Sequence, residues 1–130
     1  MIVVDTSVWV AALRGANPSP ADTLNSLLDA DKVALALPVR LELVAGVVKA
    51  DRGALRRALA ALPVIRPDDA LWERVEDWID RAAARGHRFD IPDLLIGALA
   101  ADLGALVWSL DRDFERMEKL GFVHLYGHPA

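Results

Sequence analysis

Three short apolar runs without alternation constrain the fold of this chain more than any other feature. They cover residues 2–5, 33–37 and 106–110, and a segment with helical spacing follows each of them. A strand that is apolar on both faces has to be covered on both faces, which is typical of parallel strands connected by helices. The sequence therefore predicts an α/β fold with a mainly parallel central sheet.

Segments with the 3.6-residue periodicity of amphipathic helices separate these runs. Pro38 suits the first turn of one of them, because the N–H group that proline lacks has no partner there. Two further short strands are expected at residues 64–65 and 122–126. The predicted helices cover residues 6–13, 21–30, 38–49, 51–62, 68–84, 92–103 and 113–120.

Length and composition favour one globular domain over residues 1–130, since 54% of the 130 residues are hydrophobic and 26% are charged. The absence of cysteine excludes disulfides and thiolate metal sites, so a metal would be held by oxygen or imidazole. The three histidines lack ligand spacing and are assigned no chemistry. No signal segment and no apolar run of about 18 residues is found, which predicts a cytoplasmic protein.

Carboxylates stand where the predicted strands end. Asp5 closes the first apolar run, and Asp111 and Asp113 follow the run 106–110. In parallel sheets the reactive crevice lies beyond the carboxyl ends of the strands. Two helical acids complete the set: Glu42 interrupts the apolar pattern of its helix, and Asp93 lies in the first turn of another.

Each of these acids has a simpler interpretation when it is considered alone. Asp5 could cap the helix that follows it, and Asp90 could cap the predicted helix at residues 92–103. At Asp93, in the first turn of that helix, the helix dipole favours a negative charge. Asp111 and Asp113 could belong to a polar loop. Acids from four separate segments nevertheless point to one edge of the sheet, where two charges 4 Å apart repel by about 4 kcal/mol at an effective dielectric near 20. A divalent cation would offset this repulsion, and oxygen ligands favour Mg²⁺ or Mn²⁺.

The net charge of −4 does not exclude a nucleic-acid substrate. If bound metal neutralises the five candidate acids, the net charge of the chain changes from −4 to +1. Each helical acid is also followed four residues later by glycine, at Gly46 and Gly97. Residues four apart share a helix face, so these glycines predict room for an ion and a substrate strand.

Three segments and one helical acid resemble the PIN-domain ribonucleases, most closely the VapC toxins of type II toxin–antitoxin pairs. The segments are residues 2–7, 91–100 and 109–114, and the acid is Glu42. The resemblance implies a three-layer α/β/α sandwich, and Mg²⁺- or Mn²⁺-dependent endonucleolytic cleavage of RNA. It also implies a homodimer and a small antitoxin that blocks the site.

The resemblance implies roles for individual residues of this chain. Asp5, Glu42, Asp93 and Asp111 would be catalytic and would hold metal, with Asp113 as an alternative or additional ligand. The two residues that follow Asp5 are Thr6 and Ser7. They could contact the scissile phosphate or a metal-bound water, or could serve only as helix caps. Both a one-ion and a two-ion site fit the sequence, and the RNA that is cut is left open.

Other functions fit the sequence less well. A receiver domain needs a lysine after a late strand, and a haloacid-dehalogenase-like domain needs a second aspartate two residues after Asp5, where Ser7 stands. The stronger alternative is a catalytically inactive PIN-fold module that binds RNA or protein.

Residues 68–84 and their neighbours carry two features with competing interpretations. Arg81, Arg85 and Arg88 could track phosphates, but their alternation with acids favours an ordinary solvated face. Trp72 and Trp78 could form an interface, but large aromatic residues on an amphipathic helix favour the core.

Overall fold

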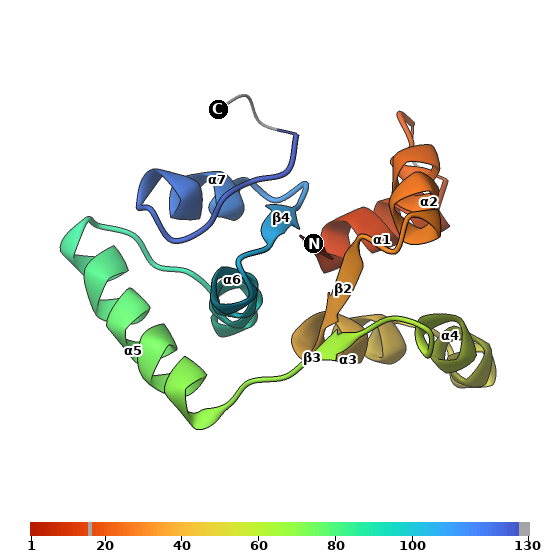
Figure 1. The fold of residues 1–130 in the computed structure, drawn as a ribbon, viewed down its shortest axis with the longest axis horizontal. Helices are drawn as coiled ribbons and strands as arrows, with labels where there is room; N and C mark the ends of the chain where they lie inside the picture. Colours follow the sequence, from red (N-terminus) through yellow and green to blue (C-terminus); the bar gives the residue numbers. More distant parts are fainter. Residues whose placement is uncertain (16, 128–130) are drawn as a thin grey trace.

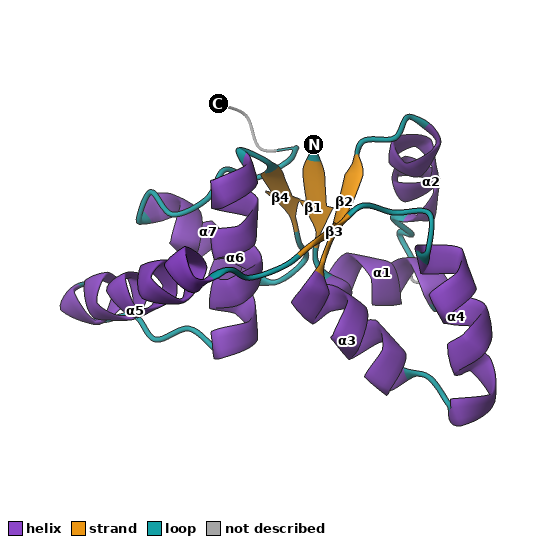
Figure 2. Cartoon of the chain, turned by 60° about the horizontal axis from the view of Figure 1, so that its bottom comes forward, coloured by secondary structure: helices purple, strands orange, loops and turns teal. Residues whose placement is uncertain are grey.

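The computed structural model describes residues 1–15 and 17–127, so His128 lies outside the described residues. Four parallel strands form the sheet in the order β3-β2-β1-β4. Helices α5, α6 and α7 lie on one side of the sheet and α1 to α4 lie on the other (Figures 1 and 2). The strands are β1 (Ile2–Val4), β2 (Val33–Ala36), β3 (Val64–Ile65) and β4 (Leu106–Trp108). This α/β sandwich confirms the predicted fold class.

Every residue of β1 and β2 is buried, which explains why their apolar residues do not alternate. β1 is central: its Val3 pairs with Ala34 of β2 on one side and with Val107 of β4 on the other. Helix α6 packs across β1, β2 and β4. The carboxyl end of β1 therefore lies in the middle of the sheet, between the two helical layers.

The helices form where the sequence predicts them. α3 is shorter than predicted because it ends at Gly46, and a 3₁₀ turn, η1 (Lys49–Asp51), comes before α4. Among the described residues, no helix is long and apolar enough to cross a membrane. The helices are α1 (Thr6–Leu13), α2 (Ala21–Asp29), α3 (Leu37–Gly46), α4 (Arg52–Leu59), α5 (Asp69–Ala84), α6 (Ile91–Leu103) and α7 (Arg112–Lys119).

The predicted last strand at residues 122–126 is wrong. This segment makes only an isolated parallel bridge between Leu125 and Val107 of β4. The amide of Leu125 faces away from β4 and donates to the carboxylate of Glu118, at 2.7 Å. Pairing with β4 ends after the one bridge, so the segment passes beside β4 without becoming a regular strand.

Gly97 serves packing, so its predicted role in substrate access is wrong. A Cβ atom at this buried position would lie 3.2 Å from Val123 Cγ1 and 3.3 Å from both Met117 Sδ and Trp78 Cζ3. The glycine therefore lets α6 approach α5 and α7 closely. Around Gly46, by contrast, nothing lies within 4 Å of such an atom.

The two tryptophans of α5 differ. Trp78 is buried and stacks on Phe122 with ring centroids 4.4 Å apart, as predicted for a core residue. Trp72 is 49% exposed, so its predicted place in the core is wrong. It lines an open groove together with Pro92 and Leu95 of α6.

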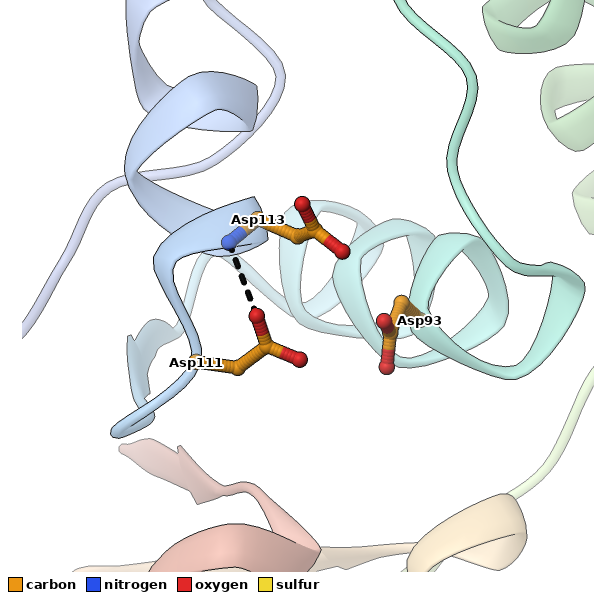
Figure 3. Close-up of side chains that lie close together, drawn as sticks. All are labelled: Asp93, Asp111 and Asp113. Carbon is orange, nitrogen blue, oxygen red and sulfur yellow. Dashed lines mark hydrogen bonds between the residues drawn. The ribbon is translucent and has the colours of Figure 1, made fainter.

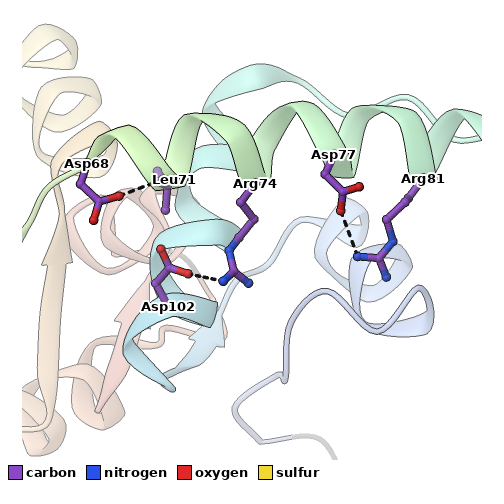
Figure 4. Close-up of polar contacts among 6 residues, drawn as sticks. All are labelled: Asp68, Leu71, Arg74, Asp77, Arg81 and Asp102. Atoms are coloured by element: carbon purple, nitrogen blue, oxygen red, sulfur yellow. Dashed lines mark hydrogen bonds and ion pairs between the residues drawn. The ribbon is translucent and has the colours of Figure 1, made fainter.

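Charged residues of α5 pair along the edge of the helix that borders α6 and Phe122 (Figure 4). Arg81 lies 3.5 Å from Asp77 and covers the ring of Phe122, with 5.0 Å between its guanidinium carbon and the ring centroid. Arg74 forms a 2.8 Å salt bridge with Asp102 and so joins α5 to α6. These contacts favour the solvated-face interpretation over a phosphate-binding stripe.

Candidate metal centre

Asp5, the residue directly after β1, is the one buried charged or polar residue among those the structure describes. Its Oδ2 accepts hydrogen bonds from the hydroxyls of Ser7, at 2.7 Å, and Ser109, at 2.8 Å. Asp5 stands at the N-cap position of α1, but its side chain makes no capping hydrogen bond. The helix-cap interpretation of Asp5 is therefore wrong, and two hydroxyls hold its carboxylate.

The same two serines fix the loop that follows β4. Ser7 Oγ accepts a hydrogen bond from the amide of Leu110 at 3.0 Å, and Ser109 Oγ accepts one from the amide of Asp111 at 2.9 Å. Asp5 and Asp111, which are far apart in sequence, are thereby tied to one another through short contacts. Sequence reasoning missed Ser109 because it was counted as part of an apolar strand, although its position directly before the acids was a usable signal.

Three carboxylates converge between α6 and the start of α7 (Figure 3). One oxygen from each of Asp93, Asp111 and Asp113 lies within 4.8 Å of the other two. Asp111 Oδ1 also caps α7 by accepting from the amide of Asp113 at 2.9 Å, and Asp113 Oδ1 pairs with Arg116 at 2.7 Å. The helix start thus fixes two of the three acids, and α6 brings the third to them.

The electrostatics of this cluster are unfavourable without a cation. The pKa of Asp93 is raised to about 7, chiefly by desolvation and in addition by the negative charges of Asp5, Asp111, Asp113 and Asp90. Asp5 therefore lies close enough to act on the cluster. Asp90 stands at the N-cap position of α6 without a capping hydrogen bond, so the cap predicted for it is not formed.

Glu42, an exposed residue of α3, stands apart from the three-acid cluster. Its Oε1 accepts a hydrogen bond from Thr6 at 3.1 Å. Partial desolvation raises the pKa of Glu42, the Thr6 hydrogen bond lowers it by less, and the charge of Asp5 adds to the rise. The structure thus brings Asp93, Asp111 and Asp113 together and sets Asp5 beside them, with Glu42 connected through Thr6 and Asp5.

The arrangement fits a divalent cation with oxygen ligands. Asp111 and Asp113 each use one oxygen for a hydrogen bond or ion pair, which leaves the second oxygen of each available. Mg²⁺ takes one or two direct carboxylates and keeps several waters, so a cluster of this size is sufficient. Arg116 is the single basic side chain that forms a salt bridge with these acids in the described parts of the chain.

The sequence model of the PIN domain matches residues 2–120. The chain belongs to the PIN-domain family. Ribonuclease VapC11 of Mycobacterium tuberculosis strain H37Rv is 33% identical over 125 residues, which cover 92% of this chain and 93% of the relative. This PIN domain therefore shares nearly its whole length with a curated ribonuclease.

Solved structures give the same result for the fold. VapBC-1 from nontypeable Haemophilus influenzae superposes with a TM-score of 0.77 at 18% identity, over 97% of each chain. VapBC-5 from Mycobacterium tuberculosis, a member of the VapBC family of toxin–antitoxin systems, superposes with a TM-score of 0.64 at 28% identity, over 95% of this chain and 94% of that one. The fold of this PIN domain is thus shared with a chain of each of these two structures.

Proposed function

We propose that this PIN domain is a metal-dependent endoribonuclease and the toxin of a toxin–antitoxin pair, acting in the cytoplasm. The observation that carries the proposal is the convergence of Asp93, Asp111 and Asp113, beside buried Asp5, at the end of the central strands. A cluster with this much repulsion is stable only with a bound cation or a retained proton. The ribonuclease name of the 33% identical relative supports RNA as the substrate class.

Mg²⁺ or Mn²⁺ held by these acids would neutralise phosphate oxygens and lower the pKa of a water nucleophile. Asp93, Asp111 and Asp5 are the proposed metal-holding residues, with Asp113 as a further ligand through its free oxygen. Glu42 would hold or accept a proton on the substrate side, because its pKa is raised and its carboxylate is solvent-accessible.

Thr6 and Ser7 are the proposed substrate-side hydroxyls. Thr6 donates to Glu42, and a phosphate oxygen that replaced this acceptor could take the same proton. Ser7 already donates to Asp5 and accepts from Leu110, so its main contribution would be to position the Asp5 carboxylate.

Cleavage of a structured RNA with and without Mn²⁺ tests the proposal, using wild type, Asp93→Asn and Asp80→Asn. Asp80 is an exposed acid of α5 and supplies the matched control. Metal-dependent cleavage should be kept in the control and lost in Asp93→Asn. Equal activity in all three proteins, or none in wild type, would favour the inactive binding module instead.

An apolar groove beside Glu42 supports the proposed antitoxin partner. It has a volume of about 580 Å³ and is lined by Leu41, Trp72, Pro92 and Leu95 with Glu42 and Arg66. Leu41 is 59% exposed and Trp72 49% exposed, which leaves apolar surface for a partner to cover. An antitoxin segment seated there would lie against Glu42 and obstruct the acids.

The antitoxin proposal is tested with the double variant Leu41→Ser/Trp72→Ala. The cognate antitoxin should inhibit RNA cleavage by wild type and fail to inhibit the variant at the same concentration. Inhibition of both proteins at equal concentrations would place the antitoxin elsewhere. The homodimer, which the family resemblance implies, is tested separately by sedimentation equilibrium of the chain alone.

A further inference from the structure

The segment from residue 43 to residue 66, which follows Glu42, carries the opposite charge from the rest of the chain. Residues 43–66 hold five basic residues and one acid, Asp51, for a net charge of +4, whereas the whole chain has −4. The remaining residues therefore carry −8. The five basic residues are Lys49, Arg52, Arg56, Arg57 and Arg66.

Three of these residues, Lys49 of η1 and Arg56 and Arg57 of α4, are together called the basic surface. All three are exposed, and none of them forms a salt bridge in the described residues. The guanidinium of Arg57 extends along the backbone of Gly53, because an ideal Cβ there would lie 3.4 Å from Arg57 Nη1. Unpaired cations in solvent are free to bind an anionic partner.

The basic residues of α5 are a contrast within the same molecule. Arg74 and Arg81 are both paired, with Asp102 and Asp77 respectively. Arg52 is also engaged, since its Nε donates to the carbonyl oxygen of Val44 at 3.2 Å and so joins α4 to α3. Lys49, Arg56 and Arg57 are thus set apart from these engaged cations by having no partner of their own.

The end of the basic surface at Lys49 is connected to Glu42 through α3. Lys49 follows Glu42 by seven residues, of which four complete α3. At about 1.5 Å per helical residue and at most about 3.4 Å per extended residue, the two Cα atoms are within about 16 Å of one another. This corresponds to about five nucleotides at 3.4 Å each. α3 and α4 also lie on the same side of the sheet (Figure 2).

We propose that Lys49, Arg56 and Arg57 bind the phosphodiester backbone of the RNA substrate a few nucleotides from the bond that is cut. The inference rests on the proposed function and assigns the acidic centre and the basic surface to different parts of one strand. Arginine presents a planar fork that matches phosphate oxygens. The contacts would be independent of base sequence and would weaken with salt.

Salt-dependent binding of a 20-nucleotide single-stranded RNA tests this inference, measured by fluorescence anisotropy in the Asp93→Asn background so that the RNA stays intact. The quantity measured is the slope of the logarithm of the RNA association constant against the logarithm of the salt concentration. In the double variant Arg56→Gln/Arg57→Gln this slope should fall in magnitude by about 1.4, since each lost phosphate contact with single-stranded RNA contributes about 0.7 to it. The affinity at 50 mM salt should fall about tenfold.

Two double variants serve as controls. Arg74→Gln/Arg81→Gln removes the same charge from paired residues and should leave the slope unchanged. Arg56→Lys/Arg57→Lys keeps the charge and should keep most of the slope. An unchanged slope in Arg56→Gln/Arg57→Gln, or an equal loss in the α5 control, would overturn the inference. So would weaker binding of the antitoxin with unchanged binding of RNA, which would assign the surface to a protein partner.

The two proposals fail in different ways. If wild type does not cleave RNA but the slope falls as stated, the nuclease proposal fails and the basic surface stands as an RNA-binding surface. If wild type cleaves RNA and the slope does not change, only the basic surface is wrong.

Discussion

The two sides of the site differ in how their acids are held. On the α6–α7 side, Asp93, Asp111 and Asp113 bring carboxylate oxygens within 4.8 Å of one another. On the α1–α3 side, Asp5 and Glu42 accept hydrogen bonds from neighbouring hydroxyls. The first side leaves like charges facing each other and depends on a cation. The second side is satisfied largely within the chain. The difference indicates a division of work, in which the α6–α7 acids hold the metal with Asp5 beside them, and Glu42 with its partner Thr6 faces the substrate.

The largest expected effect separates the two sides directly. Asp93→Asn should lower cleavage at least about 100-fold and weaken Mn²⁺ binding, because it removes a central ligand. Glu42→Gln should also lower cleavage but keep Mn²⁺ affinity within about threefold of wild type. Cleavage rates and Mn²⁺ titration by calorimetry measure both quantities. Equal loss of Mn²⁺ affinity in the two variants would remove the distinction between the two sides.

Stability without metal should depend on pH because of Asp93. Its pKa is raised to about 7 in the folded protein, against about 4 in an unfolded chain. Between these values the folded state binds more protons at Asp93, so the contribution of Asp93 to stability is fully present below pH 4, falls as pH rises, and is lost above pH 7.

We expect a loss of about 2 kcal/mol over this range, after a discount for solvent screening. Chemical denaturation in EDTA at pH 5 and pH 8 measures the loss. Asp93→Asn should be more stable than wild type at pH 8 and should show a smaller loss between the two pH values. A variant with the wild-type pH dependence would show that another group is responsible.

Ser109→Ala should lower cleavage about tenfold, as is usual for residues that hold a metal ligand in place. The hydroxyl donates to Asp5 and accepts from the amide of Asp111, so both sides of the site lose a contact. Ser109→Thr keeps the hydroxyl and should recover most of the activity. If the threonine variant is as slow as the alanine variant, the side-chain volume matters rather than these hydrogen bonds. The metal concentration at half-maximal rate should rise in the alanine variant alone.

Gly97→Ala gives the smallest expected effect, a destabilisation of about 1 kcal/mol. The added methyl group would press on Trp78, whose ring is fixed by stacking on Phe122, and this outweighs the gain in helix propensity. Gly46→Ala is the control and should be neutral or slightly stabilising. Thermal unfolding of both variants measures the difference. A stabilised Gly97→Ala variant would show that the space beside α6 accommodates a methyl group.

The fold was predictable where local pattern and tertiary packing agree. The fully buried strands have no polar face, so the covered parallel sheet followed from their residues alone. The segment 122–126 has the composition of a strand, but it meets β4 only at the single bridge between Leu125 and Val107. Such a contact between two segments leaves no trace in a residue pattern.

The site was predictable as a set of acids but not as an arrangement. Position at strand and helix ends identified Asp5, Asp93 and Asp111, whose geometry depends on the loop that Ser109 fixes. Periodicity indicated the helix face of Gly97 but not that Val123 and Met117 fill the space opposite it. The division between the two sides of the site depends on hydroxyl partners, which sequence spacing does not reveal.

The most direct test of the account is an anomalous diffraction map from crystals of the wild-type chain soaked in Mn²⁺. The account predicts a Mn²⁺ peak within coordination distance of Asp93 and at least one of Asp111 and Asp113. A map in which Mn²⁺ binds only elsewhere, at a concentration that supports RNA cleavage, would contradict it.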